Sequence, residues 1–422
     1  MQRAIWGTSS NRILFFALCL CAFNIMTWWI GHDGVIKYLF RYTVLLISFI
    51  LIYYAFIKRC GKVKISLMSL LWCPFFLYII MRMNVSTVSD LGIIIIYFYA
   101  FVLISFVRVD IRVFYYPMHI IFVLSMIYAL TVILQLIVPD VITRLSLVFS
   151  SHITEDVVLR QRMVNLSGIV GSVAYSAGYA ANIIAFLLIC KKCSLHIKFT
   201  YFCLVTQCAA LVLSGKRAHM LFCTLAILYT LWQINMCKLS VRKLLKLIVA
   251  CILVTTILVI GTLYFSDMGV FSRVRSTLLS LRQGGDVTSG RTFLYQRAFE
   301  LFEQSPIIGV GWGNYDGMLK GQLLSVHNSY LQILCETGII GELLFVIPLL
   351  CTLLYTCKRL RKSIHANIDK WSKICLSYSI YLQIFFILYS LTGSIIIYHG
   401  YILLYFFACA IAQAYIYESG VE

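Results

Sequence analysis

Apolar runs of about 18 to 25 residues recur along almost the whole chain, and each is long enough to cross the hydrocarbon core of a bilayer. Of the 422 residues, 61% are apolar, and the mean hydropathy is +0.92. No low-complexity linker and no second soluble stretch interrupts this pattern. The sequence therefore predicts an all-α, polytopic membrane protein that folds as a single domain over residues 1–422.

Twelve membrane-spanning helices are expected. Their approximate ranges are 12–30, 38–57, 65–81, 92–107, 114–137, 166–190, 198–213, 218–236, 247–266, 329–357, 374–391 and 394–417. If the N-terminus is cytoplasmic, the inner loops are short and carry 21 of the 35 Lys and Arg residues. This positive-inside pattern predicts that both termini are cytoplasmic and that the long segments 138–165 and 267–328 lie on the outer side of the membrane.

The two sides of the membrane also differ in the kind of basic residue. By the topology above, the inner loops hold 13 Lys and 8 Arg, whereas the outer segments hold 3 Lys and 11 Arg. Lysine on the inner side is an orientation signal. Arginine has a planar guanidinium that binds phosphate or carboxylate through two parallel hydrogen bonds. The outer arginines are therefore either structural or ligands for an anionic substrate.

Two outer segments place basic residues directly beside a span. Arg160 and Arg162 precede the sixth expected span, whose many small residues allow close helix packing. Lys216 and Arg217 lie in the short turn between the seventh and eighth spans. Adjacent cations at a membrane boundary require water, a counter-charge or a ligand. We expect these side chains to line an outer anion-binding site.

The outer segment 267–328 is the longest polar stretch, and it contains a predicted short amphipathic helix over residues 292–304. Ser289 is its expected cap and Pro306 ends it. Its apolar stripe consists of Leu294, Ala298 and Leu301. The helix would place Arg291 at its first turn and would either lie on the membrane surface or cover a cavity.

A glycine-rich stretch follows this predicted helix. It reads Gly309-Val-Gly311-Trp312-Gly313-Asn314-Tyr315. Such a stretch is typical of a turn, and contact with a phosphate is the alternative.

His327 stands at the end of the same outer segment, directly before the tenth expected span. Asn328 or Ser329 is expected to cap that helix. A helix N-terminus disfavours a further positive charge and should help to keep the imidazole neutral. A neutral histidine can act as a general base toward a sugar hydroxyl. His327 is therefore the candidate catalytic residue, with an ordinary boundary histidine as the alternative interpretation and His219 in reserve.

Neither a metal nor another cofactor is expected. The chain has only 16 Asp and Glu residues, no Asp-x-Asp pair, no phosphate-binding loop of the Walker type and no His/Cys cluster with metal spacing. A bound anion is therefore expected to be neutralised by arginine. Because no compact basic domain is present, a nucleic-acid partner is not expected either.

Three groups of residues, taken in order, carry a resemblance to a known family. They are Ser214-Gly-Lys-Arg217-Ala; Ser289-Gly-Arg291 with Pro306-Ile-Ile-Gly309-Val-Gly311-Trp-Gly313-Asn-Tyr315; and His327-Asn328-Ser-Tyr330-Leu331 with Glu336-Thr-Gly338-Ile-Ile-Gly341. This set resembles the O-antigen ligase/polymerase superfamily of bacterial inner-membrane glycosyltransferases. The similarity covers residues 210–345.

The resemblance implies a metal-independent transferase whose donor is a glycan on undecaprenyl pyrophosphate, used at the periplasmic face of the inner membrane. By position, Arg217 and Arg291 look like pyrophosphate-binding residues and His327 looks like the catalytic base. Attack from the face opposite the pyrophosphate would invert the anomeric centre. The implied partners are the lipid-linked oligosaccharide, the bilayer and, for a polymerase, a chain-length regulator protein.

Two activities within the superfamily stay open at this point. A polymerase moves the growing glycan onto a new lipid-linked repeat unit, and a ligase moves it onto lipid A–core. The Lys216-Arg217-Ala218 turn, the Ser289-Gly290-Arg291 stretch and the glycine-rich stretch look more like those of polymerases, which makes polymerase the leading prediction. A transporter or flippase of lipid-linked sugars is the alternative from another class, although the two halves show no repeat.

Overall fold

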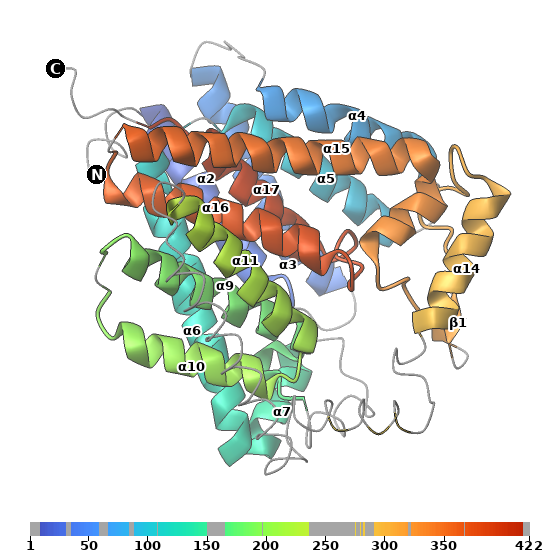
Figure 1. Cartoon of the computed structure of the whole chain (residues 1–422), viewed down its shortest axis with the longest axis horizontal. Helices are drawn as coiled ribbons and strands as arrows, with labels where there is room; N and C mark the ends of the chain where they lie inside the picture. Colours follow the sequence, from blue (N-terminus) through green and yellow to red (C-terminus); the bar gives the residue numbers. More distant parts are fainter. Residues whose placement is uncertain are drawn as a thin grey trace. The chain divides into compact units, whose positions relative to one another are not determined.

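The computed structural model describes residues 9–30, 35–58, 66–83, 88–107, 109–149, 165–195, 197–235, 275, 279, 282, 291–319, 322–366 and 368–416. Regular structure in these ranges is helical apart from one pair of two-residue strands (Figure 1). Within them, six helices are long and apolar enough to cross a membrane. Each expected span except 247–266 overlaps a helix, and that one lies outside the described residues. The count of twelve spans stays a prediction.

The chain divides into two compact units, which are described separately. The first unit comprises Met1–Trp28, Arg41–Ile120 and Thr288–Glu422. Its elements are α2 (Ser9–Thr27), most of α3 (Val35–Lys58), α4 (Leu67–Arg82), α5 (Val88–Phe106), the 3₁₀ helix η1 (Ile111–Phe114), the start of α6 (Tyr115–Ile137), α14 (Arg291–Gln304), β1 (Met318–Leu319), β2 (Gln322–Leu323), α15 (Ser329–His365), α16 (Lys370–Tyr389) and α17 (His399–Gln413). The strands pair antiparallel, with Met318 opposite Leu323.

The core of the first unit forms around α17, which packs against α2, α5, α15 and α16. Every residue of α17 from Gly400 to Ala412 is buried. A helix that is apolar on all sides belongs inside a protein or in lipid, and here neighbouring helices cover it. Trp72 of α4 joins the layers, because its ring lies 6.1 Å from that of Phe345 in α15 and 5.0 Å from that of Phe406 in α17.

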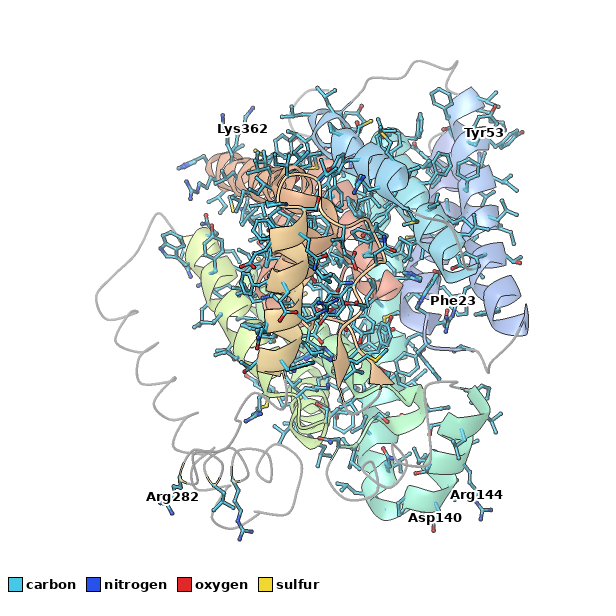
Figure 2. All side chains as sticks on the ribbon, turned by 90° about the vertical axis from the view of Figure 1, so that its right-hand side faces the viewer. Phe23, Tyr53, Asp140, Arg144, Arg282 and Lys362 are labelled. Carbon is cyan, nitrogen blue, oxygen red and sulfur yellow. The ribbon has the colours of Figure 1, made fainter. Side chains whose placement is uncertain are left out.

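The outer faces of α3 and α15 carry regularly spaced, exposed apolar residues. On α15 these are Ile339, Leu343, Ile347, Leu350 and Leu354, and on α3 they are Leu46, Ile50, Tyr53 and Ile57. Figure 2 shows Tyr53 at the periphery, pointing away from the rest of the unit. Spacings of three and four residues put each set on one side of its helix. Such stripes would be costly in water and are typical of helices that face lipid.

Contacts at the two ends of the first unit follow the expected alternation of its helices. At one end, Ser66 Oγ donates a hydrogen bond to the carbonyl oxygen of Ile104 over 3.2 Å. At the other end, Arg82 Nη2 donates to the carbonyl oxygen of Gly309 over 2.8 Å. The predicted topology assigns the first pair to the inner side and the second pair to the outer side. Which end faces the cytoplasm stays a prediction.

Helix α15 differs from its predicted span in two ways. It continues to His365, beyond the expected end at residue 357, because its last turns are rich in Lys and Arg, which favour helix and can project into water. It is also interrupted at Gly338, whose φ and ψ are 68° and −171°. This interruption shapes the candidate site described below.

The second unit comprises Trp29–Phe40 and Ile121–Val287. Its described elements include the rest of α6, α7 (Pro139–Phe149), η2 (Gly168–Val170), α9 (Val173–Lys192), α10 (Thr200–Leu213) and α11 (Arg217–Asn235). Helix α9 is buried along nearly its whole length between α10 and α11. Its small residues permit this close packing, as the sequence predicted. Helix α7 was not predicted, because residues 138–165 were interpreted as a polar outer segment.

Candidate active site

His327 directly precedes the first turn of α15 and is half-buried. Of the two expected caps, Asn328 is the one observed: its side-chain oxygen accepts a hydrogen bond from the backbone N–H of Leu331 over 3.1 Å. His327 itself has a φ of 58°, in the left-handed region that residues with a Cβ seldom occupy. The chain therefore turns sharply at His327 as it enters the helix.

The connection between α16 and α17 holds this turn in place. The backbone N–H of His327 donates to Ser394 Oγ over 2.9 Å. Ser329, two residues later, donates from its backbone N–H to the carbonyl oxygen of Ser390 over 2.8 Å and from its hydroxyl to that of Gly393 over 2.7 Å. Three hydrogen bonds from two residues fix the backbone on both sides of Asn328. These hydrogen bonds offset the free-energy cost of the unfavourable backbone angle at His327.

Helix α14 confirms the amphipathic helix expected over residues 292–304. Its buried residues are Leu294, Ala298 and Leu301, the stripe identified in the sequence. This stripe packs on the first turns of α15 and on the residues that flank His327. The buried cluster there consists of Ala298, Leu301, Tyr315, Val326, Leu331 and Cys335. The α14 helix therefore covers the N-terminal end of α15, with the turn at His327 beside it.

Arg291 is the first residue of α14 and is half-buried. It lies three residues before Leu294, so helical spacing places it on the same side of α14 as the buried stripe. That side faces α15. Within the described part of the chain, no acidic side chain forms an ion pair with Arg291.

Arg297, two turns further along α14, has a different role. Its Nε and Nη2 donate to the two carboxylate oxygens of Asp316 over 2.9 and 2.8 Å, and Nη1 donates to Glu300 over 3.1 Å. These hydrogen bonds hold the pKa of Asp316 below its ordinary value. Arg297 thus ties the segment after the glycine-rich stretch onto α14.

The glycines of the outer segment and of α15 permit two stretches of backbone to touch. A Cβ on Gly309 would lie 2.3 Å from the backbone of Glu336, and one on Gly338 would lie 2.3 Å from the backbone of Ile307. Both glycines also have positive φ. The start of the stretch Gly309–Tyr315 therefore packs directly against the backbone of α15, which agrees with the interpretation of this stretch as a turn. Gly313 is the exception, since nothing lies within 4 Å of an added Cβ there.

This contact also completes the hydrogen bonding of the interrupted helix. The break at Gly338 frees carbonyl groups in α15, and those of Cys335 and Glu336 accept from Val310 N over 3.0 Å and from Gly311 N over 2.8 Å. Irregular backbone at membrane depth is tolerated where protein groups satisfy it. The side chain of Glu336 is fully enclosed and accepts from Gln332 Nε2 over 3.3 Å.

Two residues of this arrangement were not found from the sequence. Ser394 is distant in the chain from His327, and no local pattern connects them. Arg82 was counted among the outer arginines without an assigned role, and the structure places its Nη2 against the carbonyl oxygen of Gly309. Its position at the outer end of a span could have indicated a link to the outer segment.

The remaining candidate residues belong to the second unit or lie outside the described residues. Arg217 is exposed at the start of α11, and Lys216 before it is half-buried. The turn that carries them is made by Gly215, with a φ of 66°. His219, the reserve base, is completely buried and so cannot meet a substrate hydroxyl. Arg160 and Arg162 lie outside the described residues.

The structure thus brings Arg291 and His327 into one unit, on elements that pack together, and places Lys216 and Arg217 in the other. In the part of the chain that is described, no three His, Cys, Asp or Glu side chains gather as metal ligands would.

A model of the family described as O-antigen ligase matches residues 202–346. This range contains Arg217, Arg291 and His327, and the match confirms the resemblance drawn from residues 210–345. No curated protein matches the chain. The match to this family model supports an O-antigen ligase/polymerase-type function, and together with the apolar helices it supports a multi-pass membrane protein.

Proposed function

We propose that this chain, which carries an O-antigen ligase-type domain over residues 202–346, is an inner-membrane glycosyltransferase that polymerises a surface polysaccharide. Its donor would be the growing glycan on undecaprenyl pyrophosphate, and its acceptor a newly arrived lipid-linked repeat unit at the periplasmic face. The observation that carries the proposal is the fixed, half-buried placement of His327 beside the helix that begins with Arg291.

His327 is proposed as the general base of the transfer. Its imidazole would accept the proton of the acceptor hydroxyl while the hydroxyl oxygen forms a bond to the anomeric carbon of the donor. The bond from that carbon to the pyrophosphate oxygen breaks on the opposite face, which inverts the centre. The hydrogen bonds from His327 and Ser329 to the α16–α17 connection support this role, because a base must be held in position to act efficiently.

Arg291 and Arg217 are proposed to bind the pyrophosphate. Charge develops on the leaving group as its bond breaks, and a fixed guanidinium stabilises that charge. Arg291 supports this role through its half-buried position and through the absence of an acidic partner among the described residues. Arg160, Arg162 and Lys216 are weaker candidates for the same anion. Under this proposal, arginine takes the part that a metal ion plays in other transferases.

Polymerase is favoured over ligase on three sequence features: the Lys216-Arg217-Ala218 turn, the Ser289-Gly290-Arg291 stretch and the Gly311-Trp312-Gly313-Asn314-Tyr315 stretch. The ligase is the second candidate, and the description of the matching family model favours it. Both activities use the same donor and the same base. They differ in the acceptor, and the experiment must therefore identify the acceptor.

The test is the lipopolysaccharide of a strain that lacks the gene, separated on a gel. A polymerase predicts core that carries a single repeat unit, with no ladder of longer chains. A ligase predicts bare core, with long polymer retained on undecaprenyl pyrophosphate. An unchanged ladder, together with unchanged capsule and other surface glycans, would contradict both. Complementation with the unaltered gene should restore the ladder and serves as the control.

A further inference from the structure

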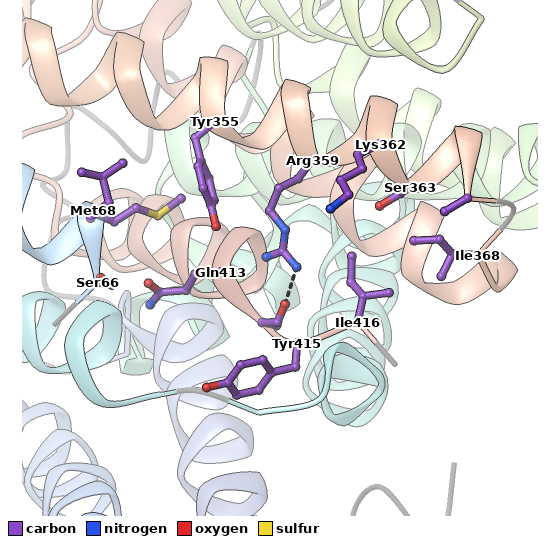
Figure 3. A pocket seen from close by; sticks show the side chains of 13 residues that line it. Ser66, Met68, Tyr355, Arg359, Lys362, Ser363, Ile368, Gln413, Tyr415 and Ile416 are labelled. Carbon is purple, nitrogen blue, oxygen red and sulfur yellow. Dashed lines mark hydrogen bonds between the residues drawn. The ribbon is translucent and has the colours of Figure 1, made fainter. Parts of the chain in front are cut away.

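A cavity of about 480 Å³ opens in the first unit at the end of α15 remote from His327 (Figure 3). It lies between the start of α4, the last turns of α15 and the residues that follow α17. Arg359, Lys362 and Ser363 line it from α15, and Gln413 and Tyr415 line it from the end of α17. Lys362 lies 33 positions after Ser329, which corresponds to about 50 Å of helix. This cavity is therefore separate from the candidate active site.

Two cations face this cavity, and no acid among the described lining residues balances them. The guanidinium of Arg359 is fixed, because Nη2 donates to the carbonyl oxygen of Ala414 over 2.7 Å and Nη1 donates to that of Ala412. Lys362 is exposed at the edge of the molecule (Figure 2), and in the close view it lies among the residues that line the same space (Figure 3). Clustered, partly enclosed cations are costly unless an anion joins them.

Two acids on segments that adjoin these elements, Asp369 and Asp110, have other partners. Asp369, which begins α16, accepts hydrogen bonds from both the backbone N–H and the hydroxyl of Ser372. Asp110, whose segment pairs with Tyr415, forms an ion pair with Arg112 at 2.6 Å. Among the described residues, no ion pair joins Asp369 or Asp110 to Arg359 or Lys362.

The rim of the cavity continues into apolar surface. Leu67, which lines the cavity at the start of α4, is 59% exposed. From there, the exposed apolar residues Leu70 and Leu77 of α4 extend toward the middle of the predicted membrane span. A ligand with a phosphate at one end and hydrocarbon at the other would match both parts.

We propose that this cavity binds the phosphate of an anionic membrane lipid, with Arg359 and Lys362 as its ligands and the hydrocarbon chains along α4. Basic pockets between membrane helices on the cytoplasmic side are suited to such headgroups. The predicted topology places the end of α15 on that side. The proposal does not depend on the activity assigned to His327.

The test uses the full-length protein in detergent and native mass spectrometry, with phosphatidylglycerol, phosphatidylethanolamine and inorganic phosphate as separate probes. We expect phosphatidylglycerol to be retained in preference to phosphatidylethanolamine. Lys362→Ala should weaken that retention about fivefold, as expected for the loss of one cation near a lipid phosphate. Lys362 is exposed, so its replacement should leave folding intact, which the thermal unfolding midpoint checks.

Lys358→Ala is the matched control, because Lys358 is an exposed lysine one helical turn away that does not line the cavity. It should retain the lipid as the unaltered protein does. Inorganic phosphate at millimolar concentration that binds alone and displaces the lipid would support a phosphate site but assign it to a soluble anion. Equal losses in the two variants, or no preference between the two lipids, would overturn the proposal.

Discussion

Ser394 Oγ accepts a hydrogen bond from the backbone N–H of His327 over 2.9 Å, although 67 positions separate the two residues in the chain. The left-handed backbone angle of His327 costs roughly 1 to 2 kcal/mol. The bond to Ser394, together with those of Ser329, offsets that cost. The connection between α16 and α17 therefore determines the direction in which the candidate base leaves the backbone.

Replacing Ser394 with alanine tests this relationship. A lost hydrogen bond of this kind costs about 1 kcal/mol, so we expect Ser394→Ala to lower the transfer rate roughly fivefold. The measurement is glycan transfer per folded protein. Ser390→Ala is the control, because the Ser390 hydroxyl donates locally to Phe386 and its backbone carbonyl, which binds Ser329, is kept. Equal rates in the two variants would remove Ser394 as a positioning residue.

His327→Ala should abolish most of the transfer while leaving the protein folded. Removal of a general base lowers turnover by about 10²- to 10⁴-fold. The measurement is the polysaccharide ladder in a complemented deletion strain, with membrane levels of the protein determined in parallel. His365→Ala is the control, because this exposed histidine lies at the opposite end of the same helix. A normal ladder with His327→Ala would exclude His327 as the base and favour the transporter alternative.

Arg291→Ala and Arg297→Ala should behave differently although both arginines lie on α14. We expect Arg291→Ala to lower turnover by about 10²-fold or more, because a donor to the developing charge is lost. Arg291→Lys should restore only part of the lost turnover, because lysine cannot make the planar, two-point contact that a guanidinium makes with a phosphate. Arg297→Ala removes the contacts with Asp316 and Glu300 and should mainly lower the unfolding midpoint. Similar turnover in Arg291→Ala and Arg297→Ala would contradict a separate role for Arg291.

Substitution of the contacting glycines should destabilise the first unit. Gly309→Ala and Gly338→Ala each force a Cβ to 2.3 Å from backbone atoms that cannot move aside easily. We expect each substitution to lower the free energy of unfolding by about 2 kcal/mol or more, because steric overlap is added to the unfavourable positive φ. Gly313 has open space around it, so Gly313→Ala should lower the free energy of unfolding by only about 1 kcal/mol, because only the positive φ is unfavourable for alanine. Thermal unfolding in detergent measures all three, and equal midpoints would contradict the close backbone contact.

The ion pair between Arg297 and Asp316 predicts a pH effect. The pKa of Asp316 lies below its ordinary value of 3.8 because Arg297 hydrogen-bonds to the carboxylate, while the pKa of Arg297 is raised and its charge persists. The ion pair therefore stabilises the folded protein fully above about pH 4, and this contribution to the free energy of unfolding is lost as the pH falls through the lowered pKa of Asp316. The unfolding midpoint of the unaltered protein should exceed that of Asp316→Asn at pH 7, and the difference should shrink by pH 3. A constant difference would contradict this assignment.

Local sequence determined the features that depend on neighbours in the chain. The apolar runs located the helices, since length and hydropathy decide what can cross lipid. The stripe of Leu294, Ala298 and Leu301 located α14 and its buried face, because helical spacing alone decides which residues share a side. The same kind of local pattern offered Asn328 and Ser329 as caps of α15, and the structure shows that Asn328 is the cap. Arg291, Arg217 and His327 were identified from motifs, and their roles stay predictions.

Only the tertiary structure decided the features that depend on distant contacts. At the break of α15, Gly338 packs directly against the backbone of Ile307. The sequence around Gly338 contains no signal from which this contact could have been predicted. The bond between His327 and Ser394 likewise joins segments that no period or motif connects. The cavity beside Arg359 exists because three helix ends meet there. Sequence patterns record which residues share a face of one helix, whereas packing between helices decides which of those faces meet.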